Sequence, residues 1–159
     1  FNMARMFVKQ DDAEKAKSYY LQAMQQETDQ KLLEDYYYEY AFFIFAKDNN
    51  YVEARNYARK ALAINPDNCK ALMLIGDIYI ASSRTFSSDN FEKAAVMWLA
   101  VDYFIKAKSG EDCLVDASQK ANRYRTYFPN KEEAFFLSIK EGDVYKVGGW
   151  INETTRARF

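Results

Sequence analysis

Residues 54–79 read ARNYARKALAINPDNCKALMLIGDIY, and this stretch decides the fold. It contains two runs of small or apolar residues at helical spacing, one on each side of Pro66: Ala54, Ala58 and Ala61 before it, and Leu72, Ile75 and Tyr79 after it. Spacings of three and four residues place side chains on one face of a helix. Because proline cannot continue a helix, the stretch predicts two helices joined by a short turn.

The same two-helix pattern recurs along the chain. A small or apolar pair followed one turn later by an apolar or small residue occurs four times, at Met3-Ala4 with Phe7, Ala41-Phe42 with Phe45, Ile75-Gly76 with Tyr79 and Ala117-Ser118 with Ala121. A second helical run follows the first three, at Ala16, Tyr20 and Ala23, at Ala54, Ala58 and Ala61, and at Ala94, Trp98 and Val101. Helix-capping residues with a glutamate three positions later precede these runs, at Asp11 and Glu14, Asn50 and Glu53, and Asp89 and Glu92.

A helix pair of this size cannot bury its own apolar face and has to stack on a neighbouring pair. We therefore predict an all-α chain with three stacked helix pairs in residues 1–108, the first helix being truncated, and a closing helix in residues 109–128.

The run Leu72, Ile75-Gly76 and Tyr79 resembles the first helix of a tetratricopeptide repeat. Ala54, Ala58, Ala61 and Pro66 resemble the second helix and closing proline of the unit before it. The resemblance covers about residues 1–108 and implies a right-handed superhelix whose first helices line a concave groove for a peptide or protein. Ala16, Ala54 and Ala94 are 38 and 40 residues apart, whereas the family repeats every 34.

Two segments depart from a regular repeat. Seven of the ten residues 36–45 are aromatic, so the helix over residues 35–47 is apolar all round and should be covered all round at the centre of the stack. The third unit has six extra residues in its turn, and this serine-rich insertion at residues 82–90 is predicted to be a solvated loop.

The last part of the chain, residues 129–159, is predicted to be a short helix and a tail packed on the repeats. Pro129 ends the last long helix, and a short helix is expected over residues 131–139. Residues 143–147 and 150–155 flank Gly148-Gly149 and predict a β-hairpin. The VGGWINETT segment is similar to the ending of a group of mostly exported bacterial repeat proteins, and this resemblance implies a periplasmic or cell-envelope location.

Composition argues against several classes of function. The 159 residues include 22 Lys and Arg against 23 Asp and Glu, so nothing in the charge favours binding to nucleic acid or to an anionic membrane. No apolar run approaches the roughly 20 residues of a membrane span, so we expect no direct membrane insertion.

Nothing in the sequence points to a metal or a cofactor. Histidine, the commonest general base and metal ligand, is absent. Cys69 and Cys113 have no CxxC spacing and no histidine beside them, so neither is expected to be catalytic, and whether they pair is open.

The predicted groove takes its residues from the first helix of each unit. The candidates that we expect to contact a peptide are Arg5, Tyr36, Glu39, Tyr40, Phe43, Lys70, Met73 and Asp77. An aromatic groove suits an extended or apolar segment, because tyrosine offers a large contact area at low entropic cost. A carboxylate clamp would need Lys, Asn and Arg across three units, and only Lys70 is suitably placed. We therefore predict a non-enzymatic scaffold that binds a protein or peptide.

Two alternatives remain open from the sequence. In the first, the chain is a structural module whose own tail fills the groove, with Trp150 and Ile151 as the plug. In the second, which is disfavoured, the chain is a hydrolase that uses a carboxylate pair. The candidate pairs lie so close in sequence that their side chains should diverge; they are Asp11 with Asp12, Glu132 with Glu133, and Glu141 with Asp143.

Overall fold

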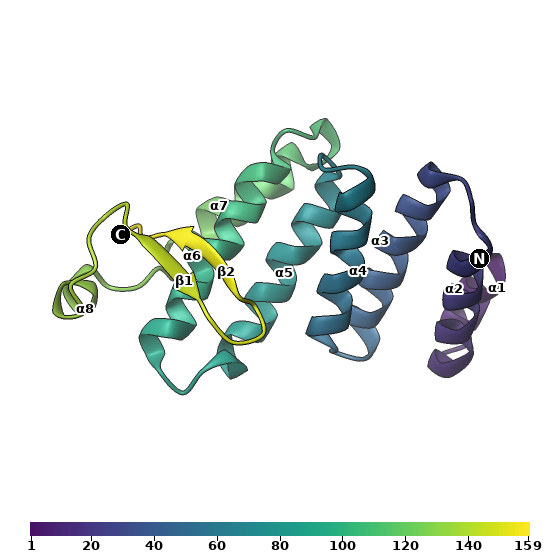
Figure 1. The fold of residues 1–159 in the computed structure, drawn as a ribbon, viewed down its shortest axis with the longest axis horizontal. Coiled ribbons are helices and arrows are strands. Elements are labelled where there is room, and N and C mark those ends of the chain that lie inside the picture. The colour runs from purple at the N-terminus through teal and green to yellow at the C-terminus, as the bar shows by residue number, and fades with distance from the viewer.

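The computed structural model describes all residues 1–159, and helices account for most of them (Figure 1). The helices are α1 Asn2–Lys9, α2 Ala13–Gln26, α3 Gln30–Lys47, α4 Tyr51–Ile64, α5 Cys69–Phe86, α6 Asn90–Ala107, the short 3-10 helix η1 Glu111–Cys113, α7 Leu114–Arg125 and α8 Lys131–Phe136. Two strands follow, β1 Val144–Val147 and β2 Glu153–Arg156. The predicted all-α class with a short carboxyl-terminal hairpin is confirmed.

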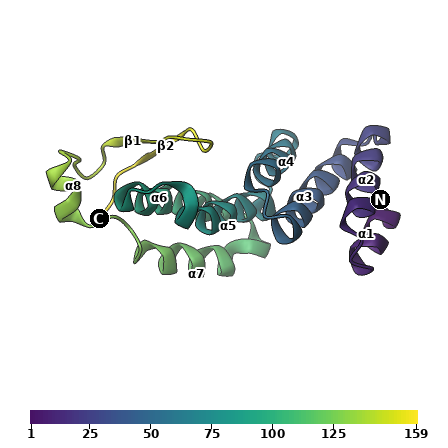
Figure 2. The same cartoon turned by 90° about the horizontal axis from the view of Figure 1, so that it is seen from below.

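The helices pack in sequence order along one elongated molecule, from α1 and α2 at one end to α8 at the other (Figure 1). The contacts of α3 with α4 and of α5 with α6 are the most extensive, whereas α2 and α3 make fewer contacts. Figure 2 shows the hairpin on one side of the α5–α6 pair, whereas α7 lies on the opposite side.

Side-chain caps define the start of the second helix in each pair. Asn50 and Asp89 accept hydrogen bonds from the backbone N–H groups of Glu53 and Glu92, as the sequence predicted. In the first pair the cap is Asp12 and not the predicted Asp11. Asp11 lies one residue earlier in a tight turn with φ 57°, a conformation that aspartate tolerates better than most residues.

Small residues allow the helices to approach closely. Ala54, Ala58 and Ala61 of α4 are completely buried. Gly76 of α5 faces the ring of Phe104 on α6, and a Cβ atom at this glycine would lie 2.4 Å from the ring. The glycine in the tetratricopeptide-like run is therefore required by the packing of α5 against α6.

The aromatic helix α3 is not covered all round, contrary to the prediction. Tyr40, Phe43 and Ile44 are buried, but Phe42 is 52% exposed. Tyr20 of α2 packs on both Tyr40 and Phe43, with ring centroids 5.7 and 5.5 Å apart. Neighbouring helices thus cover one side of α3 and leave the side of Phe42 open.

The serine-rich insertion is mostly helix and not the predicted solvated loop. Helix α5 continues to Phe86, and both Ser82 and Ser83 are buried. Their hydroxyl groups donate to the carbonyl oxygens of Tyr79 and Ile80, which satisfies them inside the helix. Only residues 87–89 connect α5 to α6.

The last thirty residues form α8 and an antiparallel hairpin. Val144 pairs with Arg156 and Val147 pairs with Glu153 across the two strands. Helix α8 ends at Phe136, three residues earlier than predicted, and Ser138 then adopts φ 60°. The hairpin packs on α6 through both strands, so the end of the chain covers the last helix pair.

Candidate functional site: a groove across α1, α3, α5 and α7

Two adjoining cavities lie on the side of the molecule formed by α1, α3, α5 and α7. The larger has a volume of about 570 Å³ and is lined by Phe1, Asn2, Arg5, Leu32, Asp35, Tyr36, Tyr38, Glu39, Asn68 and Lys70. The smaller has a volume of about 250 Å³ and is lined by Tyr38, Phe42, Lys70, Met73, Leu74, Asp77, Asp112, Cys113 and Asp116. Since Tyr38 and Lys70 line both, the two cavities form one continuous depression, which we call the groove.

Helical spacing explains why these residues share one surface. Residues 32, 35, 36 and 39 of α3 occupy positions i, i+3, i+4 and i+7 of one helix face, as do residues 70, 73, 74 and 77 of α5. Asp112 of η1 and Asp116 of α7 are also four positions apart. Each helix therefore contributes one stripe of side chains, and stacking brings the stripes together.

At one end of the groove an ion pair joins α1 to α3. Arg5 donates from Nε to Oε2 of Glu39 over 3.0 Å and from Nη2 to the other carboxylate oxygen. The ring of Phe1 stacks on the ring of Tyr36, with centroids 3.8 Å apart. These contacts place a neutralised charge pair beside an aromatic wall.

At the other end a lysine from α7 reaches the groove. Lys120 Nζ lies 2.6 Å from both carboxylate oxygens of Asp77. Burial raises the pKa of Asp77 above its usual value, although the ammonium group of Lys120 acts in the opposite direction. Asp77 is therefore a partly desolvated carboxylate that already has a partner.

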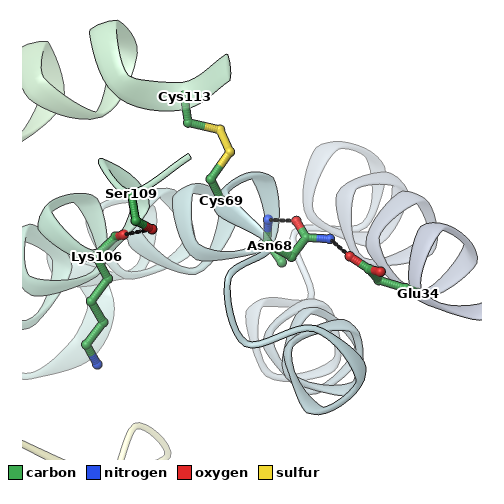
Figure 3. The surroundings of a disulfide bond; sticks show 7 residues. Glu34, Asn68, Cys69, Lys106, Ser109 and Cys113 are labelled. Atoms are coloured by element: carbon green, nitrogen blue, oxygen red, sulfur yellow. Dashed lines mark hydrogen bonds between the residues drawn. A yellow bond between two sulfur atoms is a disulfide. The ribbon is translucent and has the colours of Figure 1, made fainter. Parts of the chain in front are cut away.

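A disulfide bond between Cys69 and Cys113 ties the end of η1, directly before α7, to the first residue of α5 (Figure 3). The two Cα atoms are 6.0 Å apart, and Cys113 itself lines the smaller cavity. Gly110 makes this approach possible, because a Cβ atom there would lie 2.6 Å from Cβ of Cys69. The sequence left the pairing of the two cysteines open, and the structure pairs them.

The neighbouring residue, Asn68, links the same corner to α3. Its side-chain oxygen accepts from the N–H of Ala71 at the start of α5, and its amide group donates to Glu34 over 2.6 Å (Figure 3). Burial of Glu34 disfavours its charged form, but hydrogen bonds from Asn65, Lys31 and Asn68 outweigh this and lower its pKa. Through these bonds the buried carboxylate of Glu34 ties Asn68, which lines the larger cavity, to α3.

Six of the eight predicted groove residues line this depression, and two do not. Arg5, Tyr36, Glu39 and Lys70 line the larger cavity, and Lys70, Met73 and Asp77 line the smaller one.

Tyr40 and Phe43 are buried in the core and are corrections to the prediction. Tyr20 of α2 covers both, and the hydroxyl of Tyr40 donates to Glu53 over 2.7 Å. Burial and this hydrogen bond raise the pKa of Tyr40.

Sequence reasoning missed several groove residues, most importantly Tyr38, Phe42, Asp112 and Asp116. Tyr38 and Phe42 are four positions apart on α3, so the sequence predicts that they share one face of the helix. Because aromatic residues occur on every face of this helix, the sequence does not indicate which face stays exposed. Asp112 and Asp116 belong to the closing helix, which was not assigned to the groove. A search for stripes on every helix, the closing one included, would have found them.

The tail does not fill the groove, and the interpretation of Trp150 and Ile151 as a groove plug is wrong. Trp150 packs on Tyr79 and beneath the guanidinium of Arg55, whose Cζ lies 4.8 Å from the ring centroid. Ile151 is buried, and its carbonyl oxygen accepts from Arg55 over 2.8 Å. Neither residue lines either cavity, so the tail contacts the repeats at a different place.

A carboxylate on β2 anchors the tail. Glu153 accepts hydrogen bonds from Arg59 of α4, Tyr79 of α5 and Tyr103 of α6. Burial and the charge of Glu153 raise the pKa of Tyr103 to about 12, and burial also raises the pKa of Tyr79. One side chain therefore joins the hairpin to three helices.

A second polar cluster fixes the end of the chain. Asp102 of α6 accepts from the hydroxyl of Thr155 over 2.5 Å and from Arg158 over 2.7 Å. Trp98 donates from its indole N–H to the carbonyl oxygen of Arg158 over 2.6 Å. The tail is thus attached by side-chain and backbone hydrogen bonds along its length.

Three carboxylates of the candidate catalytic pairs accept hydrogen bonds from backbone N–H groups. Asp12 caps α2, Asp143 accepts from the N–H of Lys140, and Glu141 accepts from the N–H of Phe159. No group of three or more Cys, Asp and Glu side chains has an arrangement that could hold a metal ion. Likewise, none of the helices combines the length and apolar character that crossing a bilayer requires.

Comparison with known proteins adds no assignment. No family model matches the sequence, and no curated protein matches it.

Proposed function

We propose that this chain is a binding protein whose groove holds an extended segment of a partner protein. The observation that carries the proposal is that the groove crosses four helices and has an exposed aromatic side chain, Phe42, in its lining. An aromatic side chain that is exposed within the lining of a groove is available as an anchor for a partner, and aromatic anchors dominate binding energy at interfaces.

The rigidity of the groove supports the same function. Its helices are joined by the Cys69–Cys113 disulfide, by the Arg5–Glu39 pair and by the hydrogen bonds of Glu34 with Asn65 and Asn68. A preformed surface loses little conformational freedom on binding, so a partner has to lose only its own. The tail leaves this surface open because it is anchored on α4, α5 and α6 by other residues.

The proposal includes membership of the tetratricopeptide class and a role without catalysis. The helix-pair order, the buried alanines of α4 and the close approach at Gly76 support the repeat assignment. The structural roles of Asp12, Glu141 and Asp143 favour binding over hydrolysis. The disulfide supports a location in the cell envelope, because such bonds persist where thiols are oxidised.

Peptide selection tests the function. Peptides from a randomised phage-displayed library are selected on the immobilised protein, and the affinity of the enriched peptides is measured by fluorescence anisotropy. Phe42→Ala should weaken binding roughly tenfold, as expected for loss of an aromatic anchor. Phe136→Ala is the matched control: Phe136 is 84% exposed on α8, outside the groove, and its loss should leave the affinity unchanged.

Two results would contradict the proposal. One is a selection that enriches no peptide, and the other is a set of peptides whose affinity does not respond to Phe42→Ala. Thermal unfolding of both variants serves as a check that the substitutions leave the fold intact, since both side chains are exposed.

A further inference from the structure

We infer that the smaller cavity of the groove receives an arginine side chain of the partner segment. This inference rests on the proposed function and names the chemistry that the groove would recognise. It starts from the lining of the cavity, which combines two aromatic side chains, two aliphatic side chains and two carboxylates that form no ion pair within the chain.

The apolar part of the cavity comes from α3 and α5. Tyr38 and Phe42 lie one helical turn apart on α3, and Met73 and Leu74 of α5 line the same cavity. Such a surface accepts the three methylene groups of an arginine stem, which are apolar although the head group is charged. Aromatic faces also attract a guanidinium group through their electron-rich centres.

The charged part comes from the segment that leads into α7. Asp112 and Asp116 are exposed, line the cavity and form no ion pair or side-chain hydrogen bond with another residue of the chain. Asp77 already holds Lys120, and Lys70 is the only other cation in the lining. Because the lining holds two unpaired carboxylates and only one free amine, that of Lys70, the cavity attracts a positive side chain.

The disulfide gives these carboxylates a defined place. Cys113 follows Asp112 directly and is bonded to Cys69 at the start of α5, so η1 cannot move away from the cavity. Helix-dipole stabilisation accounts for acidic residues near the start of α7, but it does not require them to face a cavity with aromatic walls. The planar guanidinium of arginine can pair with a carboxylate through two hydrogen bonds and can also stack on an aromatic face, so it suits this lining better than the compact ammonium of lysine.

A double-mutant cycle tests the inference with the peptides enriched in the selection described above. Each peptide that contains arginine is resynthesised with citrulline, which keeps the shape of the side chain and removes its charge. On the unmodified protein we expect a roughly tenfold loss of affinity. On the variant Asp112→Asn/Asp116→Asn the same exchange should change affinity less than twofold, because the charge partner is gone.

Glu132→Gln/Glu133→Gln is the matched control, since it removes the same charge from exposed residues of α8 outside the groove. It should retain the tenfold citrulline effect. A citrulline effect of equal size in both double variants would overturn the inference.

The outcome also separates this inference from the proposed function. Enriched peptides without arginine that still lose affinity on Phe42→Ala would overturn the arginine site and leave the binding function standing. A selection without any enriched peptide would overturn both.

Discussion

The hydroxyl group of Tyr103 on α6 donates a hydrogen bond to Oε2 of Glu153 on β2, with 2.8 Å between the two oxygen atoms. The two residues are 50 positions apart in sequence. Arg59 and Tyr79 donate to the same carboxylate, so Glu153 satisfies donors from three helices at once. The contact explains why the tail packs on the last helix pairs and leaves the groove open.

Loss of Glu153 should destabilise the chain. Glu153→Ala leaves two tyrosine hydroxyls and a guanidinium without their acceptor, and we expect the free energy of unfolding to fall by about 3 kcal/mol. Glu153→Gln keeps one acceptor oxygen and should cost about half as much. Urea unfolding followed by circular dichroism measures both, and equal stability of Glu153→Ala and the unmodified protein would contradict the anchoring role.

The Tyr103–Glu153 contact also makes stability sensitive to high pH. The folded state holds the pKa of Tyr103 at about 12, whereas the pKa of an unfolded tyrosine is about 10. The folded chain therefore keeps a proton that the unfolded chain loses between these values. This stabilisation is fully present below about pH 10 and is lost as the pH rises through 12.

We accordingly expect the free energy of unfolding to fall between pH 10 and pH 12, with Tyr103 contributing up to about 1.4 kcal/mol per pH unit. Tyr103→Phe should make this loss less steep, and Tyr127→Phe, at an exposed position, should not. Urea titrations at several pH values give the slopes. Identical slopes for both variants would show that Tyr103 does not hold its proton.

The disulfide should contribute strongly to stability. It joins two residues that are 44 positions apart in sequence. A cross-link of this span lowers the conformational entropy of the unfolded chain and so raises the free energy of unfolding by about 4 kcal/mol. Reduction with dithiothreitol should lower the urea midpoint accordingly, and it should have no effect on Cys69→Ala/Cys113→Ala. A midpoint that is insensitive to reductant in the unmodified protein would mean that the bond is absent in solution.

Gly76→Ala tests the close approach of α5 and α6. An added methyl group would meet the ring of Phe104 at 2.4 Å, and that ring is completely buried. Overpacking of this kind costs about 1–3 kcal/mol, which exceeds the roughly 1 kcal/mol that alanine gains over glycine in a helix. We expect a lower melting temperature.

The matched control is Gly148→Ala in the hairpin turn, where a Cβ atom would meet nothing within 4 Å. Its melting temperature should equal that of the unmodified protein or exceed it slightly. A melting temperature for Gly76→Ala at or above the control would contradict the packing argument.

Local chemistry was sufficient to predict the helix pairs, their order and the hairpin. Pro66 interrupts a helical pattern, Asn50 and Asp89 cap the helices that follow them, and Gly148-Gly149 turns the chain between two strands. These signals act between residues a few positions apart, so the periodicity of the sequence and its turn residues are sufficient to predict these elements.

Long-range packing decided which of the predicted surfaces are open. Tyr20 covers Tyr40 and Phe43, while Phe42 on the same helix stays exposed, and no pattern within a helix that is aromatic on every side distinguishes these outcomes. The position of the tail depends on contacts such as Arg55 with Ile151, which are 96 residues apart. Such contacts depend on the three-dimensional stacking of whole helices, and they cannot be predicted from the spacing of residues within each helix.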